Sequence, residues 1–395
     1  MMHSVRGLVL PAILVLASVV VVAPKAGAQP TPPTAAYVYI QIQGPGGAVY
    51  GFRASSSGQL SPIPGAPWKL VGQLVGATQT KFFTAGKDLI HSYAIGADGA
   101  IGPQLGEMPA LEYAGSGCAG GNGINQAKLD HTGKYIYVLL SNGGDRPCAA
   151  YQTYIVNKDG SFTFDGDTEE ALQSGGGADI PSILGDETFA YADKQTGPLP
   201  GSGPVPTVTG FRRESSGTLE RMQFSESDPA PGNAYGYTIK QPDASPTGNY
   251  VVLQLYPGNA NPPQLASYTV DAKGNISSTN TSSNMAATTL DFPSSTFSPS
   301  GNLFAVYADN GLSAFVGQGN GVEIYKFDGA APLTFFNRPL GETPIDQVAW
   351  DSSNHLYAIS GPYNEMWVFT VTSTSVTEVG SWSIGSPYRM IVVSK

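Results

Sequence analysis

The stretch YTVDAKGNIS, residues 268–277, describes a strand, a tight turn and the start of a second strand. Gly274 suits the turn because glycine adopts a positive φ without a steric penalty. Tyr268 and Ile276 stand where both would fall on the same face of the two strands. The stretch therefore predicts a β-hairpin with one buried face.

The spacing of this hairpin recurs along the chain: an aromatic residue, a glycine six positions later and an apolar residue two positions after that. The copies begin at Phe52, Tyr93, Tyr154, Phe211 and Tyr268, with altered copies at Tyr325 and Phe369. Seven copies of one hairpin indicate a repeat architecture.

A second signature precedes most of these hairpins, as in SPTGNYVVLQL and FSPSGNLFAVY. Its turn residues include Gly133, Gly248, Gly301 and Asn354, and the last three are spaced 53 residues apart, so each repeat holds about four short strands. We therefore predict an all-β chain with a single seven-bladed β-propeller of four-stranded antiparallel blades. An irregular β-sandwich is the alternative.

The C-terminus predicts how the ring closes. The first repeat begins at Tyr37 without an inner strand, whereas YRMIVVS, residues 388–394, follows a complete seventh repeat. We expect residues 388–394 to pair with residues 37–42 as the inner strand of blade 1, which would remove an open sheet edge.

The N-terminus is typical of a secretory signal. Arg6 precedes a 16-residue apolar run, and Ala26-Gly27-Ala28 forms a small-x-small cleavage site. We predict a signal peptide at residues 1–28, a linker at 29–36, a propeller at 37–395, and a secreted or periplasmic protein. An uncleaved membrane anchor is the alternative.

The net charge of −10 disfavours polyanionic partners. There is no basic stripe, so we expect neither nucleic acid nor an anionic membrane surface as a ligand. Residues 165–170, DGDTEE, lack the spacing of a calcium loop and are interpreted as a solvated charged turn. We expect no metal and no cofactor, and a monomer. Cys118 and Cys148 are predicted to form a disulfide in an exported chain.

The quoted motifs, together with YTVDAKGNIS and FRASSSGQL, resemble those of the seven-bladed propeller lactonase family. That family includes 6-phosphogluconolactonase-type enzymes and carboxymuconate lactonizing enzymes, and the resemblance covers residues 37–395. It implies a toroid with a pocket at its central mouth. It also implies chemistry on lactones or sugar acids.

Aligning the starts of the inner strands predicts which side chains reach that mouth. Arg389 and Asp346 are the catalytic candidates, as oxyanion stabiliser and general base. Lys69-Leu70 is expected to begin the inner strand of blade 2. The candidate ligand-binding residues are Tyr388, Lys240, Asn125, Asp291, Asp179 and Trp68. The alternatives are a salt bridge between Arg389 and Asp346 that joins blades 7 and 1, and inter-blade packing for the aromatic residues.

The histidines give little support to catalysis. We expect His131 and His355 in surface turns and His91 as a hydrogen-bonded histidine between blades. Nucleophile-elbow, zinc-protease and phosphate-loop motifs are missing from the sequence.

Two classes of function remain open at this point. The first is a metal-independent protein that binds or opens a sugar lactone. The second is a non-catalytic, exported scaffold whose long loops contact another protein or a glycan.

Overall fold

The computed structural model describes residues 33–42, 47–86, 88–111, 123–142, 148–171, 180–194, 207–222, 237–257, 262–281, 283–290, 294–308 and 319–394. These residues form β-strands joined by turns and loops, with no helix among them. The predicted signal peptide at 1–28, Cys118, and most of the long loops lie outside the described residues. The described residues contain no helix that is long and apolar enough to cross a membrane.

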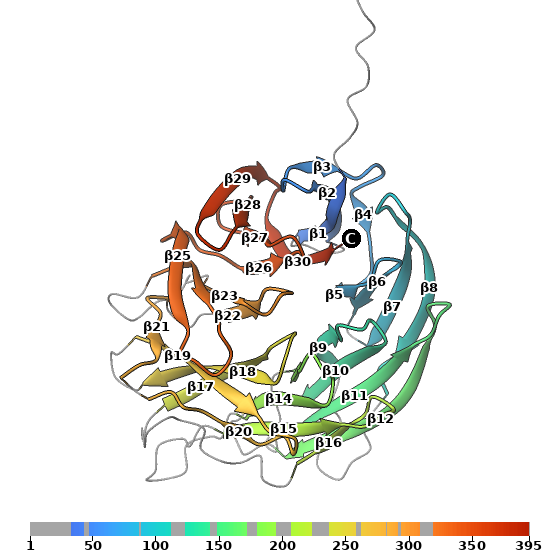
Figure 1. Cartoon of the computed structure of the whole chain (residues 1–395). Helices are drawn as coiled ribbons and strands as arrows, with labels where there is room; N and C mark the ends of the chain where they lie inside the picture. The colour runs from blue at the N-terminus through green and yellow to red at the C-terminus, as the bar shows by residue number, and fades with distance from the viewer. Residues whose placement is uncertain are drawn as a thin grey trace, which may run out of the picture. The chain divides into compact units, whose positions relative to one another are not determined.

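The strands form seven antiparallel sheets of four core strands each, arranged as the blades of a propeller (Figure 1). From the axis outward, the first three blades contain these strands: blade 1, β30 (Pro387–Ser394), β1 (Thr34–Ile42), β2 (Ala48–Ser55) and β3 (Leu60–Pro62); blade 2, β5 (Gln73–Ala77), β6 (Lys81–Ala85), β7 (Leu89–Ile95) and β8 (Ile101–Pro109); blade 3, β9 (Ile124–Leu129), β10 (Tyr135–Asn142), β11 (Cys148–Val156) and β12 (Phe162–Ala171).

The remaining blades follow the same order: blade 4, β13 (Ser182–Ile183), β14 (Phe189–Lys194), β15 (Thr207–Arg213) and β16 (Leu219–Arg221); blade 5, β17 (Tyr237–Ala244), β18 (Tyr250–Pro257), β19 (Gln264–Val270) and β20 (Ile276–Ser277); blade 6, β22 (Ser294–Phe297), β23 (Leu303–Ala308), β24 (Gly321–Lys326) and β25 (Thr334–Gly341); blade 7, β26 (Gln347–Trp350), β27 (His355–Ser360), β28 (Glu365–Val371) and β29 (Val376–Ser383). Two short strands are additional. They are β4 (Trp68–Lys69), which pairs with β2, and β21 (Ala286–Ala287), which pairs with β19.

The core lies between the blades. Seven clusters of buried apolar side chains each combine residues of two adjoining blades, including one cluster between blades 7 and 1. A single four-stranded sheet would leave one apolar face in water, and the neighbouring blade covers it. The predicted seven-bladed fold is confirmed.

The C-terminal strand closes the ring as predicted. In blade 1, β30 pairs antiparallel with β1, in a register that joins Tyr37 to Val393 and Gln41 to Arg389. β1 begins at Thr34, three residues before the predicted start of the propeller. The first blade therefore contains both ends of the folded chain, and no inner-strand edge is left open there.

The repeated hairpin joins the third and fourth strands of each blade, and its glycine also packs against another blade. Gly274 has a φ of +85°, and its carbonyl oxygen accepts a hydrogen bond of 2.8 Å from the Tyr191 hydroxyl of blade 4. Tyr39 and Tyr137 bond the equivalent carbonyl groups of Gly99 and Gly217 in the same way. These glycines therefore serve both the turn and the interface between blades.

Two predicted positions are wrong. Trp68-Lys69 forms β4 at the edge of blade 1, and the inner strand of blade 2 begins at Gln73. Residues 165–170 are not a turn, because they lie within β12, the outer strand of blade 3. In both cases the structure depends on pairing with another strand. The local sequence does not show that pairing.

Candidate functional site

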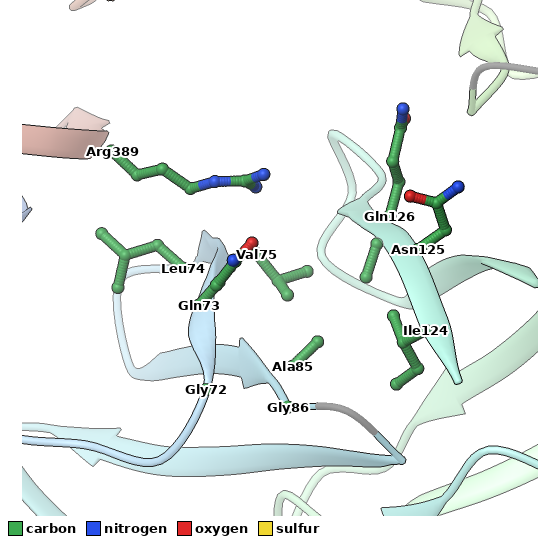
Figure 2. Close-up of a pocket in the computed structure, with 11 residues that line it drawn as sticks. Gly72, Gln73, Leu74, Val75, Ala85, Gly86, Ile124, Asn125, Gln126 and Arg389 are labelled. Atoms are coloured by element: carbon green, nitrogen blue, oxygen red, sulfur yellow. The ribbon is translucent and has the colours of Figure 1, made fainter. Parts of the chain in front are cut away.

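Arg389 lies at the start of β30, where the last strand reaches the centre of the ring. Its side chain is half-buried and extends over Leu74 and Val75 of blade 2 toward Gln126 of blade 3 (Figure 2). It lines a space of about 280 Å³, here called the side cavity. The lining residues are Gly72, Gln73, Leu74, Val75, Ala85, Gly86, Ile124, Asn125, Gln126, Ala127 and Arg389.

A larger space, here called the mouth cavity, adjoins the side cavity and holds about 490 Å³. The two cavities share Arg389 and Gln126, and the mouth cavity also reaches Asp346 and Tyr388. The structure therefore brings together three of the predicted residues in one cavity, Arg389, Asp346 and Tyr388, and places the predicted Asn125 in the adjoining one. This volume lies within the range of ordinary small-molecule sites, about 300–1,000 Å³.

Asp346 is held by blade 7 immediately before β26. Its backbone N–H donates to the carbonyl oxygen of Ile359 at 2.9 Å, and its carboxylate accepts a hydrogen bond from the backbone N–H of Gly361. Burial raises the pKa of Asp346, and the Gly361 N–H opposes that rise only in part. A carboxylate with a raised pKa is a stronger base once it is ionised.

Arg389 has no carboxylate partner among the described residues. No ion pair within 4.0 Å joins it to Asp346 or to another described side chain, although both residues line the mouth cavity. Its guanidinium carbon lies 5.6 Å from the centre of the neighbouring Tyr388 ring. The predicted alternative, a salt bridge that joins blades 7 and 1 through these two residues, is therefore not formed.

Side-chain amides join the inner strands instead. Gln347 of blade 7 donates to the carbonyl oxygen of Met390 at 2.9 Å and accepts from its N–H at 2.8 Å. Gln41 of blade 1 donates to the carbonyl oxygen of Gly72 at 2.8 Å and accepts from the N–H of Leu74 at 3.2 Å. The Gln347 amide therefore holds β30 without using the charge of Arg389, and the Gln41 amide joins blade 1 to blade 2. Neither contact is predictable from sequence, because a glutamine in a strand carries no signal of a partner far away in the chain.

Among the other predicted ligand-binding residues, only Trp68 has a described side chain, and it does not line these cavities. Asp179 and Asp291 lie outside the described residues, and Lys240 lies on β17 with a side chain that the structure does not describe. Trp68 packs between blades 1 and 2, with its ring centre 6.4 Å from that of Tyr39. Trp68 therefore packs between two blades, which was the predicted alternative to ligand binding.

The described histidines, His91, His131 and His355, do not line the side or mouth cavities. His355 is buried, with 1% of its surface exposed, and its Nδ1 lies 2.7 Å from Asp351, so the predicted surface turn is wrong. Burial alone would raise the pKa of Asp351, but hydrogen bonds from His355 and Tyr357 hold it below its usual value. His131 lies in the predicted turn and contacts the carbonyl oxygen of Leu184.

His91 is buried but does not form the predicted hydrogen bond. Its two ring nitrogens have no hydrogen-bond partner among the described residues, and Nδ1 lies 3.7 Å from Glu107. Burial lowers the pKa of His91, and the charge of Glu107 opposes this shift in part. The described residues contain no group of three or more His, Cys, Asp or Glu side chains that could hold a metal ion.

Comparison with known proteins supports the fold. No family model matches the chain, and no curated protein sequence matches it. Among solved structures, the periplasmic gluconolactonase PpgL of Pseudomonas aeruginosa is similar with a TM-score of 0.63 and 15% identity, over 91% of this chain and 99% of that chain. A "putative 6-phosphogluconolactonase" from Bacteroides uniformis is similar with a TM-score of 0.65 and 12% identity, over 91% of this chain and 100% of that chain. At these identities the likeness establishes a shared seven-bladed propeller, as the sequence motifs predicted.

Proposed function

We propose that the protein is an exported, metal-independent lactonase that binds a sugar lactone in the mouth cavity and opens it with water. The observation that carries the proposal is the pair formed by Arg389, a half-buried cation without a carboxylate partner in the described part of the chain, and Asp346, a carboxyl group with a raised pKa in the same cavity. The solved structures of similar fold support the choice of substrate class.

The proposed reaction uses Asp346 for proton transfer and Arg389 for charge stabilisation. Asp346 takes a proton from a water molecule as its oxygen bonds to the lactone carbonyl carbon, and Arg389 stabilises the negative charge that forms on the carbonyl oxygen. The ring C–O bond then breaks, and the proton on Asp346 passes to the departing alkoxide. The product is an open-chain hydroxy acid, whose carboxylate Arg389 can also bind.

Tyr388 contributes a ring surface at the rim of the cavity. It is among the few large apolar side chains that the described residues expose, with 37% of its surface accessible. A sugar ring carries C–H groups on one face, so an exposed tyrosine beside a cation suits a polyhydroxylated, polar ligand. We assign Tyr388 to substrate binding on this basis.

The test is a comparison of three variants of the mature protein. Arg389→Met keeps most of the side-chain volume and removes the charge, Asp346→Asn removes the base, and Arg212→Met is the control, because Arg212 is an exposed cation in blade 4 outside the mouth. Lactone opening is followed with a pH indicator across a panel of sugar lactones and corrected for spontaneous opening. Melting temperature is measured on the same samples.

We expect Arg389→Met to lower kcat by about 10²–10³-fold and Asp346→Asn by about 10²–10⁴-fold, with little change in melting temperature. Arg212→Met should match the wild type in both measurements. A lower melting temperature for Arg389→Met with no change in any ligand response would assign the residue to stability alone. A wild-type protein that neither binds nor opens any member of the panel would favour the non-catalytic scaffold.

Export is the second part of the proposal and has a separate test. Mass spectrometry of the protein from the extracytoplasmic fraction should give a chain that begins at Gln29. An intact N-terminus in the membrane fraction would favour the anchor instead.

A further inference from the structure

The central channel continues past the mouth cavity into a second chamber, here called the lower cavity, of about 430 Å³. Lys128 and Gln347 line both spaces, so the two are contiguous. The lower cavity is also lined by Pro246 and Pro299, which lie in turns between the first and second strands of their blades. Those turns lie at the opposite end of the inner strands from Arg389, so the lower cavity approaches the other face of the ring.

Two opposite charges face the lower cavity without meeting. Lys128 comes from β9 of blade 3 and Asp243 from β17 of blade 5, and no ion pair within 4.0 Å joins them. Asp243 accepts a hydrogen bond from Ser295 through one carboxylate oxygen. Within the described part of the chain, Lys128 has no hydrogen-bond or ion-pair partner. The two charges therefore make no direct contact, and Lys128 can bond a third group in the chamber.

Trp350 of blade 7 lines the same chamber. Trp350, on β26, has 6% of its surface exposed, and its indole N–H makes no hydrogen bond to the described residues. Because Trp350 lines the chamber, its indole signal reports on what binds there.

Burial affects the two charged groups in opposite directions. It lowers the pKa of Lys128, which the charge of Asp243 offsets only in part, and it raises the pKa of Asp243 to about 7 despite the hydrogen bond from Ser295. For both side chains, therefore, burial removes more stabilisation of the charged form than the neighbouring groups restore. An anion beside Lys128 would supply a counter-charge.

We propose that the lower cavity is a second binding site, which takes a small hydroxycarboxylic acid. The carboxylate of the ligand accepts a hydrogen bond from Lys128, and a hydroxyl of the same ligand bonds Asp243 across the channel. The volume is that of a typical small-ligand site. The site lies away from Arg389 and does not require that the mouth cavity hydrolyse a lactone.

The test uses the indole N–H signals of the mature protein in a ¹H–¹⁵N spectrum, because the chain has only four tryptophans. The signal of Trp350 is assigned as the one that a Trp350→Phe variant lacks. The probe is D-gluconate, and the control compound is sorbitol, which has the hydroxyls without the carboxylate. The variants are Lys128→Met, which removes the unpaired cation, and Arg389→Met, which removes the cation of the mouth.

We expect gluconate, but not sorbitol, to shift the Trp350 signal in the wild type and in Arg389→Met. Lys128→Met should weaken that response by at least about tenfold, the loss expected for one charge-assisted hydrogen bond. In the wild type, the proposal is overturned if gluconate leaves the Trp350 signal in place or if sorbitol shifts it equally. In the variants, it is overturned if Lys128→Met responds like the wild type, or if Arg389→Met abolishes the response as fully as Lys128→Met does. Should Lys128→Met fail to fold, the gluconate and sorbitol titrations of the wild type and Arg389→Met still decide between these outcomes.

Discussion

Replacing Gly274 by alanine should destabilise the contact between blades 4 and 5. Gly274 has a φ of +85°, and a Cβ at this position would lie 2.7 Å from the ring carbons of Phe189 and 2.7 Å from the sulfur of Met222. Phe189 and Met222 are both buried, each with 7% of its surface exposed, so Phe189 in particular has little room to move. The same turn carbonyl accepts the hydrogen bond from Tyr191.

The magnitude follows from two separable costs. A positive φ in a residue other than glycine costs about 1–2 kcal/mol. Forcing an extra methyl group into a filled interface costs about 1–3 kcal/mol more. We therefore expect Gly274→Ala to lower the free energy of unfolding by about 2–5 kcal/mol.

Gly385→Ala is the matched control. Gly385 has a similar φ of +75°, but its Cβ would meet only the Ile42 side chain, at 3.9 Å. It should cost only the conformational term, about 1–2 kcal/mol. Urea denaturation, followed by both tryptophan fluorescence and circular dichroism, measures the two variants against the wild type, provided that both probes give one transition. Equal destabilisation by the two substitutions would refute the inter-blade role assigned to the hairpin glycine.

Three further predictions concern closure, oxidation and charge. Deleting residues 386–395 removes β30 and exposes the inner edge of blade 1, so it should give insoluble or molten protein; a cooperative unfolding transition equal to that of the full chain would contradict the ring closure. Non-reducing mass spectrometry of the purified protein should find Cys118 and Cys148 joined, with a lower melting temperature after reduction, whereas two thiols that label fully in the native protein would exclude the bond. Burial raises the pKa of Asp243 from 3.8 to about 7, so the folded state binds this proton more tightly than the unfolded state, and the contribution of Asp243 to stability falls as the pH rises from about 4 to about 7. The unfolding free energy of the wild type minus that of Asp243→Asn should decrease over that interval, and a difference that does not change with pH would show that Asp243 titrates normally.

The parts of the fold that sequence predicts are those that local chemistry determines. The hairpin around Gly274 is readable because turn geometry and an alternating strand depend on neighbours within ten residues. The closing role of residues 388–394 could be predicted because a spare strand after the seventh repeat and an incomplete first repeat are both visible in the chain. Lys69 was misplaced because two short strand-like segments follow each other there, and only pairing with β2 distinguishes them.

The site was predictable only in part for the same reason. Arg389 and Asp346 emerged from aligning the inner strands, since the fold places the starts of all of them at one mouth. His355 was misassigned because its burial depends on Asp351 and on packing near Gly58 of the adjoining blade, which no local pattern reports. The amide bonds of Gln41 and Gln347, and the facing of Lys128 and Asp243, arise from segments that are distant in sequence.

The pairing of β30 with β1 also fixes how the propeller responds to mechanical force. Ala36 pairs with Ser394, so the chain enters and leaves blade 1 at the same end of one antiparallel ladder. Tension between those two ends would act first on the pair Ala36–Ser394. The hydrogen bonds between β30 and β1 would then break one after another instead of all together. A cargo fused at one end and a tether at the other would therefore pull along the direction in which this ring resists least.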